Sequence, residues 1–199
     1  YAGWVGSAYS ADKTQKKYAL NIKNSLATFG YLHISKDGAL NVNGHSTNKY
    51  TNDNANVDFY AGEFIINGTA TFDGTDAWAK YTKMSVDHAD AVLNISNGTD
   101  YEASIHNGST TGTALKFWKA GKVKVDNTSV VEIDNQTVLV EGAELNIAGA
   151  VTAKGTVSGA GSITLGAETA KLTTATTGLS VNTSLEERIV KYVDGAYQV

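Results

Sequence analysis

Short apolar segments, separated by small or polar residues, recur along most of this chain. They are most regular between Lys122 and Leu165, where one segment follows another after about six to eight residues. That spacing is too short for helices, and within each segment apolar and polar residues alternate with the period of two that β-strands show. The pattern therefore predicts an all-β protein built from many short strands.

Four of the predicted strands share one local form, in which an asparagine stands between two aliphatic residues. They are Leu20-Asn21-Ile22, Leu40-Asn41-Val42, Leu93-Asn94-Ile95 and Leu145-Asn146-Ile147. The first two lie 20 positions apart, and about 20 residues form one turn of a three-faced parallel β-solenoid. In such a fold the aliphatic side chains stack inward on those of the next turn, while Gly and Asn suit the corners. A parallel β-solenoid is therefore the predicted fold.

An antiparallel, jelly-roll-like β-sandwich is the alternative fold. Its strands recur every 8–12 residues with turn residues between them, and the first half of the chain fits that rhythm nearly as well. Two longer gaps, Gly44–Val57 and Gly74–Ala91, cause this ambiguity. If the fold is a solenoid, we expect both gaps to be loops that project from the stack.

Between residues 143 and 163 the repeat tightens to six residues, with a small residue two positions before each aliphatic one. The small residues are Ala143, Gly149, Gly155 and Gly161. These hexads resemble the left-handed β-helix of hexapeptide acyltransferases and of bactofilin filament proteins. The resemblance covers about 20 residues. The acyltransferases carry many more hexads and a catalytic histidine on a loop, and this chain has neither in register, so their activity is not carried over.

We expect residues 1–199 to form one all-β domain with distinct ends. The aromatic and basic segment Tyr1–Lys17 is predicted to cap the first rung of the stack or to insert as an arm into a neighbouring subunit. Residues 184–199 are predicted to close the other end. There, Ser184 and Glu187 have capping-box spacing, which favours one helical turn, and the last eight residues favour a hairpin that turns at Asp194-Gly195.

The Leu-Asn-Ile rungs, the Asn-Gly and Asp-Gly corners and the Thr-, Gly- and Ala-rich second half together resemble parallel β-helix modules of bacterial cell-surface proteins, of the passenger and adhesin type. The resemblance implies an extracellular, cell-surface protein with a structural or adhesive role. Its partners would be copies of itself, or glycans and proteins of a host or cell surface. The N-terminal residues lack a Met and a charged leader, and we interpret them as the processed end of a secreted protein.

The amino-acid composition disfavours several classes of function and of binding site. With 16 basic and 20 acidic residues the net charge is −4, which disfavours nucleic-acid binding because phosphates need a basic surface. The absence of cysteine excludes disulfides and cysteine metal sites. No apolar run approaches the 18 residues of a membrane-spanning helix. Proline is also absent, so turns must come from Gly, Asn and Asp.

One loop offers a candidate calcium site. Its oxygen ligands stand at alternate positions, at Asn52, Asn54, Asn56 and Asp58, and Ca²⁺ binds six to eight oxygens. The loop lacks the glycine and the bidentate glutamate of an EF-hand, so a solvated polar loop is the competing interpretation. Apart from calcium, no cofactor is expected.

Asn-x-Ser/Thr sequons are abundant, and they suggest a glycoprotein. The candidate glycosylation sites are Asn67, Asn94, Asn97, Asn107, Asn127, Asn135 and Asn182. The competing interpretation is that these triplets are simply favourable turn sequences in an Asn- and Thr-rich chain.

Two tryptophans stand beside lysines in segments that interrupt the strand rhythm. Trp78 lies in DAWAKY and Trp118 in LKFWKAG. Exposed aromatic rings of this kind stack on sugars or anchor protein contacts, and they also pack loops onto sheets. Both tryptophans are therefore candidate binding residues.

The chain carries no recognisable catalytic signature, since it lacks G-x-S-x-G, H-E-x-x-H and a P-loop. Asp87-His88-x-Asp90 has no accompanying nucleophile motif. Two carboxylate pairs, Glu132/Asp134 and Glu141/Glu144, are candidates to share a face of a β-helix as glycosidase carboxylates do, but surface charge for solubility also explains them. We therefore expect no enzyme activity.

The predicted function is that of a non-catalytic, extracellular structural or adhesion module. The first alternative is a subunit of a self-assembling filament or surface layer, because open strand edges pair readily with other chains. The second alternative is a carbohydrate-binding or carbohydrate-active β-helix protein.

Overall fold

The structure is a computed structural model of the whole chain. It describes residues 113–199 and, before them, residues 2–5, 8–9, 15–16, 19–23, 31–34, 39–43, 57–59, 64–73, 79–81, 84–96 and 102–105. Every regular element among these residues is a β-strand. The predicted all-β class is therefore confirmed.

Nearly all of the described strands belong to three sheets. Sheet 1 contains, in spatial order, β1 (Ala2–Val5), β5 (Tyr31–Ile34), β8 (Phe64–Ile66), β11 (Met84–Val86), β14 (Thr113–Phe117), β17 (Gln136–Leu139) and β20 (Val157–Gly159). Sheet 2 contains β4 (Ala19–Lys23), β6 (Ala39–Asn43), β9 (Thr69–Asp73), β12 (Val92–Ser96), β15 (Lys122–Val125), β18 (Glu144–Ile147), β21 (Ser162–Leu165) and β23 (Val181–Thr183). Sheet 3 contains β7 (Val57–Phe59), β10 (Ala79–Tyr81), β13 (Glu102–Ile105), β16 (Val130–Ile133), β19 (Ala150–Ala153), β22 (Lys171–Thr174), β25 (Ala196–Gln198) and β24 (Lys191–Val193). A separate antiparallel pair is formed by β2 (Ala8–Tyr9) and β3 (Gln15–Lys16).

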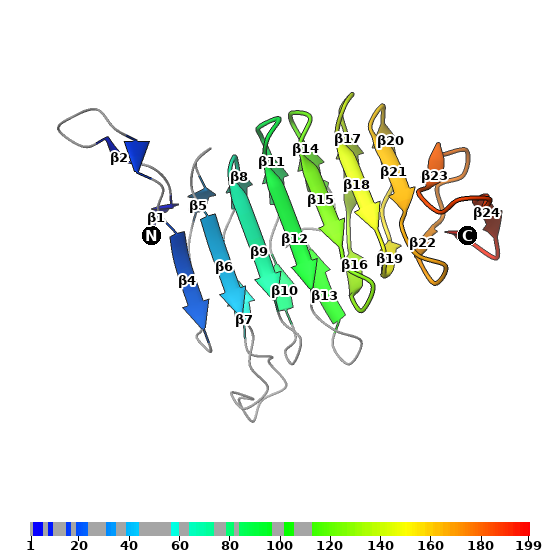
Figure 1. The fold of residues 1–199 in the computed structure, drawn as a ribbon, viewed down its shortest axis with the longest axis horizontal. Coiled ribbons are helices and arrows are strands. Elements are labelled where there is room, and N and C mark those ends of the chain that lie inside the picture. The colour runs from blue at the N-terminus through cyan, green and yellow to red at the C-terminus, as the bar shows by residue number, and fades with distance from the viewer. Residues whose placement is uncertain are drawn as a thin grey trace.

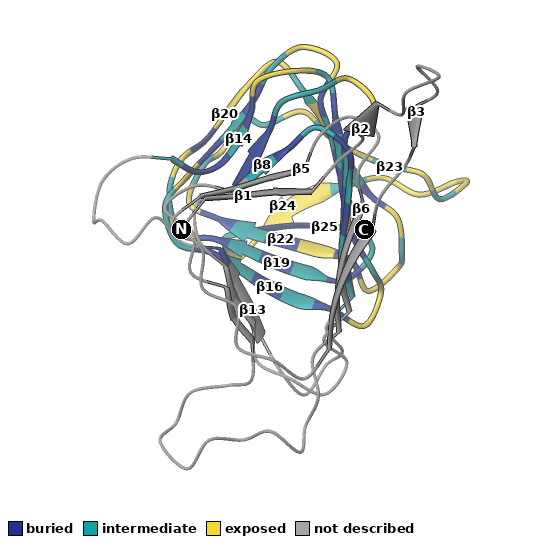
Figure 2. Ribbon diagram, turned by 90° about the vertical axis from the view of Figure 1, so that its left-hand side faces the viewer, coloured by how far each residue is buried: buried dark blue, intermediate teal, exposed yellow. Residues whose placement is uncertain are grey.

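From β5 to β22 the chain visits sheets 1, 2 and 3 in turn, and each circuit makes one coil. Neighbouring strands of successive coils pair in parallel, for example β12 with β15 and β15 with β18. Figure 1 shows these coils stacked along the long axis of the molecule, with the two chain termini at opposite ends. Figure 2 looks along the stack and shows the three sheets around one interior. The fold is the predicted parallel β-solenoid, and the β-sandwich alternative is excluded.

All four Leu-Asn-Ile or Leu-Asn-Val motifs lie in sheet 2, on β4, β6, β12 and β18. Leu20 pairs with Leu40, so the spacing of 20 residues is one coil, as predicted. The asparagines, however, lie in mid-strand and not at corners. In β12 they belong to an alternating pattern in which Leu93 and Ile95 are buried and Asn94 is only partly buried.

The core is made of such inward columns, one residue per coil. In sheet 2 the buried column runs through Ala70, Leu93, Val123, Leu145 and Ile163, each in register with the next. Burying a Val, Leu or Ile side chain contributes about 1.5–3 kcal/mol. Because each coil contacts only its neighbours, this stability accumulates coil by coil.

The six-residue repeat of residues 143–163 corresponds to one face of a coil. Each small residue lies one or two positions before a strand, and Leu145 pairs with Ile163, three hexads later. At Gly149 a Cβ atom would lie 2.2 Å from the carbonyl oxygen of Ser129 and 2.4 Å from that of Asp126. The repeat requires glycine there because the corner lies directly against the backbone of the preceding coil.

Two local expectations were wrong. The gap Gly74–Ala91 is not simply a projecting loop, because it contains β10 and β11, strands of only three residues each. The helical turn after Ser184 does not form, since Glu187 adopts a left-handed φ of 58°. The other gap lies largely outside the described residues, which resume at β7.

The terminal hairpin is confirmed. Strands β24 and β25 pair antiparallel around Asp194-Gly195, whose φ angles of 50° and 79° suit a two-residue hairpin turn. β25 also pairs antiparallel with β22 and thereby extends sheet 3. Tyr197 is buried against the last coil and contributes to the core. The division into an N-terminal cap or arm, a body and a C-terminal cap stays a prediction.

Candidate functional site

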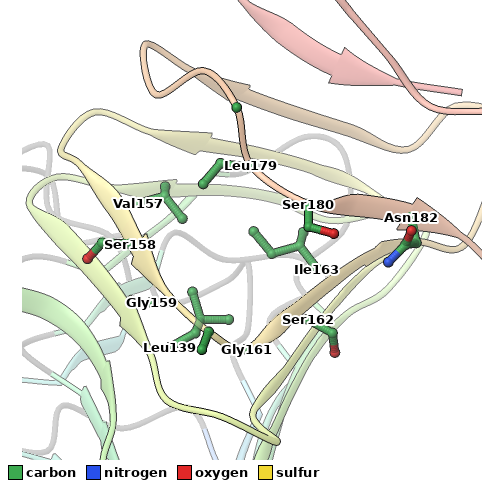
Figure 3. A pocket seen from close by; sticks show the side chains of 12 residues that line it. Leu139, Val157, Ser158, Gly159, Gly161, Ser162, Ile163, Leu179, Ser180 and Asn182 are labelled. Atoms are coloured by element: carbon green, nitrogen blue, oxygen red, sulfur yellow. The ribbon is translucent and has the colours of Figure 1, made fainter.

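A pocket of about 410 Å³ opens near the C-terminal end of the stack, beside β20 and β21. Figure 3 shows the side chains that line it. The lining residues are Leu139, Val157, Ser158, Gly159, Ala160, Gly161, Ser162, Ile163, Gly178, Leu179, Ser180 and Asn182.

The pocket exists because sheet 1 stops one coil before the other two sheets. Sheet 2 continues past β21 with β23, and sheet 3 continues past β22 with β25, but sheet 1 ends at β20. Residues 175–180 pass the place of the next strand without forming one. Instead the Val157 N–H donates to the Thr176 hydroxyl at 3.1 Å, and the Leu179 N–H donates to the Tyr197 hydroxyl at 2.9 Å.

The pocket offers apolar contacts and hydroxyl groups but no titratable side chain. Leu139, Val157, Ile163 and Leu179 supply the apolar surface, and three serines and Asn182 supply polar groups. General acid–base and nucleophilic catalysis both depend on a titratable or activated group within reach of the substrate. The pocket is therefore suited to binding an uncharged, extended or apolar group.

The suspected carboxylate pair Glu132/Asp134 is engaged by a lysine. Lys154 forms an ion pair with Glu132 and one with Asp134 at 3.1 Å. The hydrogen bond to Glu132 and then that to Asp134 raise the pKa of Lys154. The charge on both carboxylates is thus compensated by a cation on the outer face of sheet 3.

The second suspected pair, Glu141/Glu144, is divided by the structure. Glu144 lies on β18 and forms an ion pair of 2.9 Å with Lys122 on the neighbouring strand. That contact lowers the pKa of the Glu144 carboxyl. Glu141 is exposed in the turn before β18.

Within the described residues, the Asp126 carboxylate, at the corner that follows β15, has several hydrogen-bond donors. It accepts hydrogen bonds from the hydroxyls of Ser96, Ser129 and Thr128 and from the Thr128 N–H. Burial alone would raise the pKa of Asp126, but these hydrogen bonds outweigh burial and lower it. Because Ser96 belongs to the preceding coil, this carboxylate joins two coils and has a structural role.

The Asp87-His88-x-Asp90 segment forms a turn. The Asp90 N–H donates to His88 Nδ1 at 3.0 Å, and the Asp90 carboxylate lies 3.7 Å from the same nitrogen. Across the part of the chain that the structure describes, no group of three or more His, Cys, Asp or Glu side chains is arranged to hold a metal ion.

Of the two candidate tryptophans, Trp118 is described and Trp78 is not. Trp118 follows β14 and is 48% exposed. The Lys116 ammonium lies 3.2 Å from the centroid of its ring, which is a cation–π contact. One aromatic ring is thus available at the side of the stack.

The candidate calcium loop lies mainly outside the described residues. Asn52, Asn54 and Asn56 are not described, and Asp58 is known only as the middle residue of β7. Calcium binding there stays a prediction.

The sequons differ in their surroundings. Asn127 and Asn182 are exposed, whereas the Asn94 side-chain amide donates to the Thr71 hydroxyl at 3.3 Å. The Asn67 and Asn135 side chains are partly buried, and Asn97 and Asn107 lie outside the described residues. Glycosylation of any of them stays a prediction.

Sequence reasoning missed the pocket. A second feature that the structure adds is an exposed apolar surface on the closing segment. The exposed large apolar residues there are Ile189 at 67%, Tyr192 at 39% and Val193 at 42%. The run Ile189-Val190-Lys191-Tyr192-Val193 was a visible signal, but only the structure shows that its strand has no neighbour on its outer edge.

Comparison with known protein families, with curated proteins and with solved structures found no match for the chain. In the described part of the chain, no helix has the length and apolar character that a membrane crossing requires.

Proposed function

We propose that this chain is a non-catalytic structural or adhesive module of an extracellular surface. The observation that carries the proposal is the chemistry of the pocket beside β20, which is lined without any titratable side chain. Two further observations support it. The carboxylates of Glu132, Asp134 and Glu144 are paired with lysines on the outer faces, and the core is a continuous stack that holds these faces rigid.

The extracellular location and adhesive character come from the sequence resemblance to cell-surface β-helix modules. A stack of parallel coils presents long, regular outer faces, and solenoids use such extended faces for binding. Apolar and aromatic groups at one end and at one side of this stack provide contact surface of that kind.

Incubation of the purified chain with a panel of soluble polysaccharides tests the non-catalytic role. The expected result is no release of reducing ends or unsaturated products. Turnover that disappears in a Glu132→Gln or Asp134→Asn variant would contradict the proposal, because it would give those carboxylates a chemical role.

Carbohydrate binding is a second candidate function, favoured by the exposure of Trp118 at the side of the stack. A glycan array probed with the chain and with a Trp118→Ala variant tests it. Binding that is lost in Trp118→Ala but kept in Gln136→Ala, a variant at another exposed residue, would support a glycan site at Trp118. Equal binding by all three proteins would exclude that site.

A further inference from the structure

The two ends of the stack are stepped in complementary ways. Beyond the coil β20–β21–β22, sheet 1 has no further strand, sheet 2 has one and sheet 3 has two. Before the coil β5–β6–β7, sheets 1 and 2 each begin with one further strand, β1 and β4, whereas sheet 3 has none among the described residues. At the C-terminal end of the stack, sheet 3 therefore extends one strand further than sheet 2. At the N-terminal end, sheet 3 starts one strand later than sheet 2.

The outermost strand of sheet 3 has the direction that a continuing solenoid requires. β25 pairs antiparallel with β22, and β24 pairs antiparallel with β25. Two reversals cancel, so β24 runs parallel to β22 and to the other coil strands of sheet 3. The free edge of β24 therefore offers parallel pairing, which is the pairing used between the coils.

The surface around this free edge is apolar. Ile189, Tyr192 and Val193 are three of the four exposed large apolar residues in the described part of the chain. Soluble proteins usually protect edge strands with several charges or with proline. β24 contains no proline and a single charge, Lys191.

The charges at the two ends also favour contact between the C-terminal end of one copy and the N-terminal end of a second copy. β7 carries one charged residue, Asp58, opposite in sign to Lys191 of β24. Residues 12–23 contain four lysines and one aspartate, whereas residues 184–199 contain three acidic and two basic residues. Figure 1 places β4, which ends at Lys23, and β24 at opposite ends of the stack.

We propose that the C-terminal end of one copy binds the N-terminal end of a second copy of this chain, with β23 pairing with the second copy's β4 and β24 with its β7. The steps at the two ends then match: sheets 2 and 3 continue without a gap, and residues 175–180 fill the level between β20 and the second copy's β1. This inference rests on the proposed structural role and names its partner. Because the two surfaces differ, association does not close into a dimer but continues as a filament.

The first test is sedimentation velocity of the full chain over a wide concentration range. The wild type is expected to show a mean mass that rises steadily with concentration. A variant carrying Ile189→Lys and Val193→Lys is expected to stay near the monomer mass, because each lysine places a charge on the covered surface. Trp118→Lys is the control, since it places one lysine at an exposed apolar residue at the side of the stack, and it is expected to assemble like the wild type.

A mixing experiment separates end-to-end assembly from other modes and shows that the double variant is folded. Its N-terminal end is unchanged, so it is expected to add to the C-terminal end of wild-type assemblies and stop their growth. A small fraction of the variant should therefore lower the mean mass of the wild type severalfold.

Three results would overturn the proposal: a wild-type chain that is monomeric at every concentration, an assembly that stops at a dimer, or a double variant that assembles normally. None of them affects the proposed non-catalytic role, which fails only if the chain turns over a polysaccharide.

Discussion

The repeating coils of residues 122–174 and the closing segment of residues 175–199 bury the same core by different means. In the coils, strands pair in parallel, inward columns are mainly aliphatic, and Gly149 lies directly against the backbone of the preceding coil. In the closing segment β23 still pairs in parallel, but β24 and β25 pair antiparallel, and Tyr197 fills the space above Leu172, its partner in register. Here a Cβ atom on Gly195 would meet nothing within 4 Å, and its φ of +79° explains the glycine.

The difference shows that the body of the stack depends on close approach of the backbone, whereas its end depends on local turn geometry and on side chains that bond to the backbone. The Tyr192 hydroxyl donates to the Thr174 carbonyl at 2.8 Å, and the Tyr197 hydroxyl accepts from the Leu179 N–H. Substitutions in the two regions should therefore destabilise the protein for different reasons.

The largest effect is expected at Gly149, whose replacement by alanine forces a methyl group against two backbone carbonyl oxygens. Overpacking of this kind costs about 3 kcal/mol in the free energy of unfolding. Chemical denaturation of Gly149→Ala measures it. Gly166→Ala is the matched control, because its nearest atom would be the Ser184 hydroxyl oxygen at 3.7 Å, and its stability is expected to stay within about 0.5 kcal/mol of the wild type. Equal losses at the two glycines would contradict the close packing of coils at this corner.

The next largest effect is expected at Tyr197, in the closing segment. Tyr197→Phe keeps the buried ring but removes the hydroxyl that serves the Leu179 N–H and lies 3.3 Å from the Thr176 carbonyl. Leaving a partly buried donor without its partner costs about 1–2 kcal/mol. Thermal unfolding followed by circular dichroism tests this. Tyr192→Phe loses a single bond from a more exposed ring and should cost less; the reverse order would contradict the account of the closing segment.

A smaller effect of opposite sign is expected at Thr137, inside the regular coils. Its side chain stands in the inward column of sheet 1 between Leu115 and Val157, is 1% exposed, and has a hydroxyl without a hydrogen-bond partner in the described structure. Thr137→Val removes that buried polar group at nearly constant size. We expect a gain of about 1 kcal/mol in the free energy of unfolding, and a loss of that size would show that the hydroxyl is satisfied.

The smallest effect is a pH dependence at Asp126. Its pKa is lowered in the folded protein, so the folded state favours the charged form. The resulting stability is fully present above the ordinary pKa of an aspartate, about 3.9, and is lost as the pH falls through the lower folded-state pKa. The stability difference between wild type and Asp126→Asn should therefore be constant from neutral pH to about pH 5 and shrink below about pH 4.

Ser96→Ala provides the control for this pH dependence. It keeps the Asp126 carboxylate but removes one of its donors from the preceding coil, so the acid-induced loss should be smaller than in the wild type. An unchanged pH profile would mean that the hydrogen bond from Ser96 does not lower the pKa of Asp126.

The same comparison explains what the sequence could and could not reveal. The coils were predictable because Leu20, Leu40, Leu93 and Leu145 repeat at positions that share one column of sheet 2. β11 was hidden because a strand of three residues is too short to establish an alternating pattern. The closing hairpin was predictable from Asp194-Gly195, whereas the helical turn before it was not real, because a left-handed Glu187 breaks the helix that the Ser184 spacing suggested.

The pocket was beyond prediction for a related reason. Leu139, Val157 and Leu179 lie in different coils and meet only because residues 175–180 form no strand. Contacts between distant residues can be predicted from the sequence only where the repeat is regular. Residues 175–180 interrupt the repeat, so the contacts around the pocket could not be predicted.

The central claim is the register of one continuous stack, on which the pocket, the closing segment and the end-to-end contact all depend. Spin labels at position 94 paired with position 146, 164 or 182 test it most directly, because these residues belong to one column of sheet 2. They are two, three and four strands apart, so the label separation is expected to rise in that order by about 4.8 Å per strand. Separations that do not increase in the order 146, 164, 182 would contradict the stack.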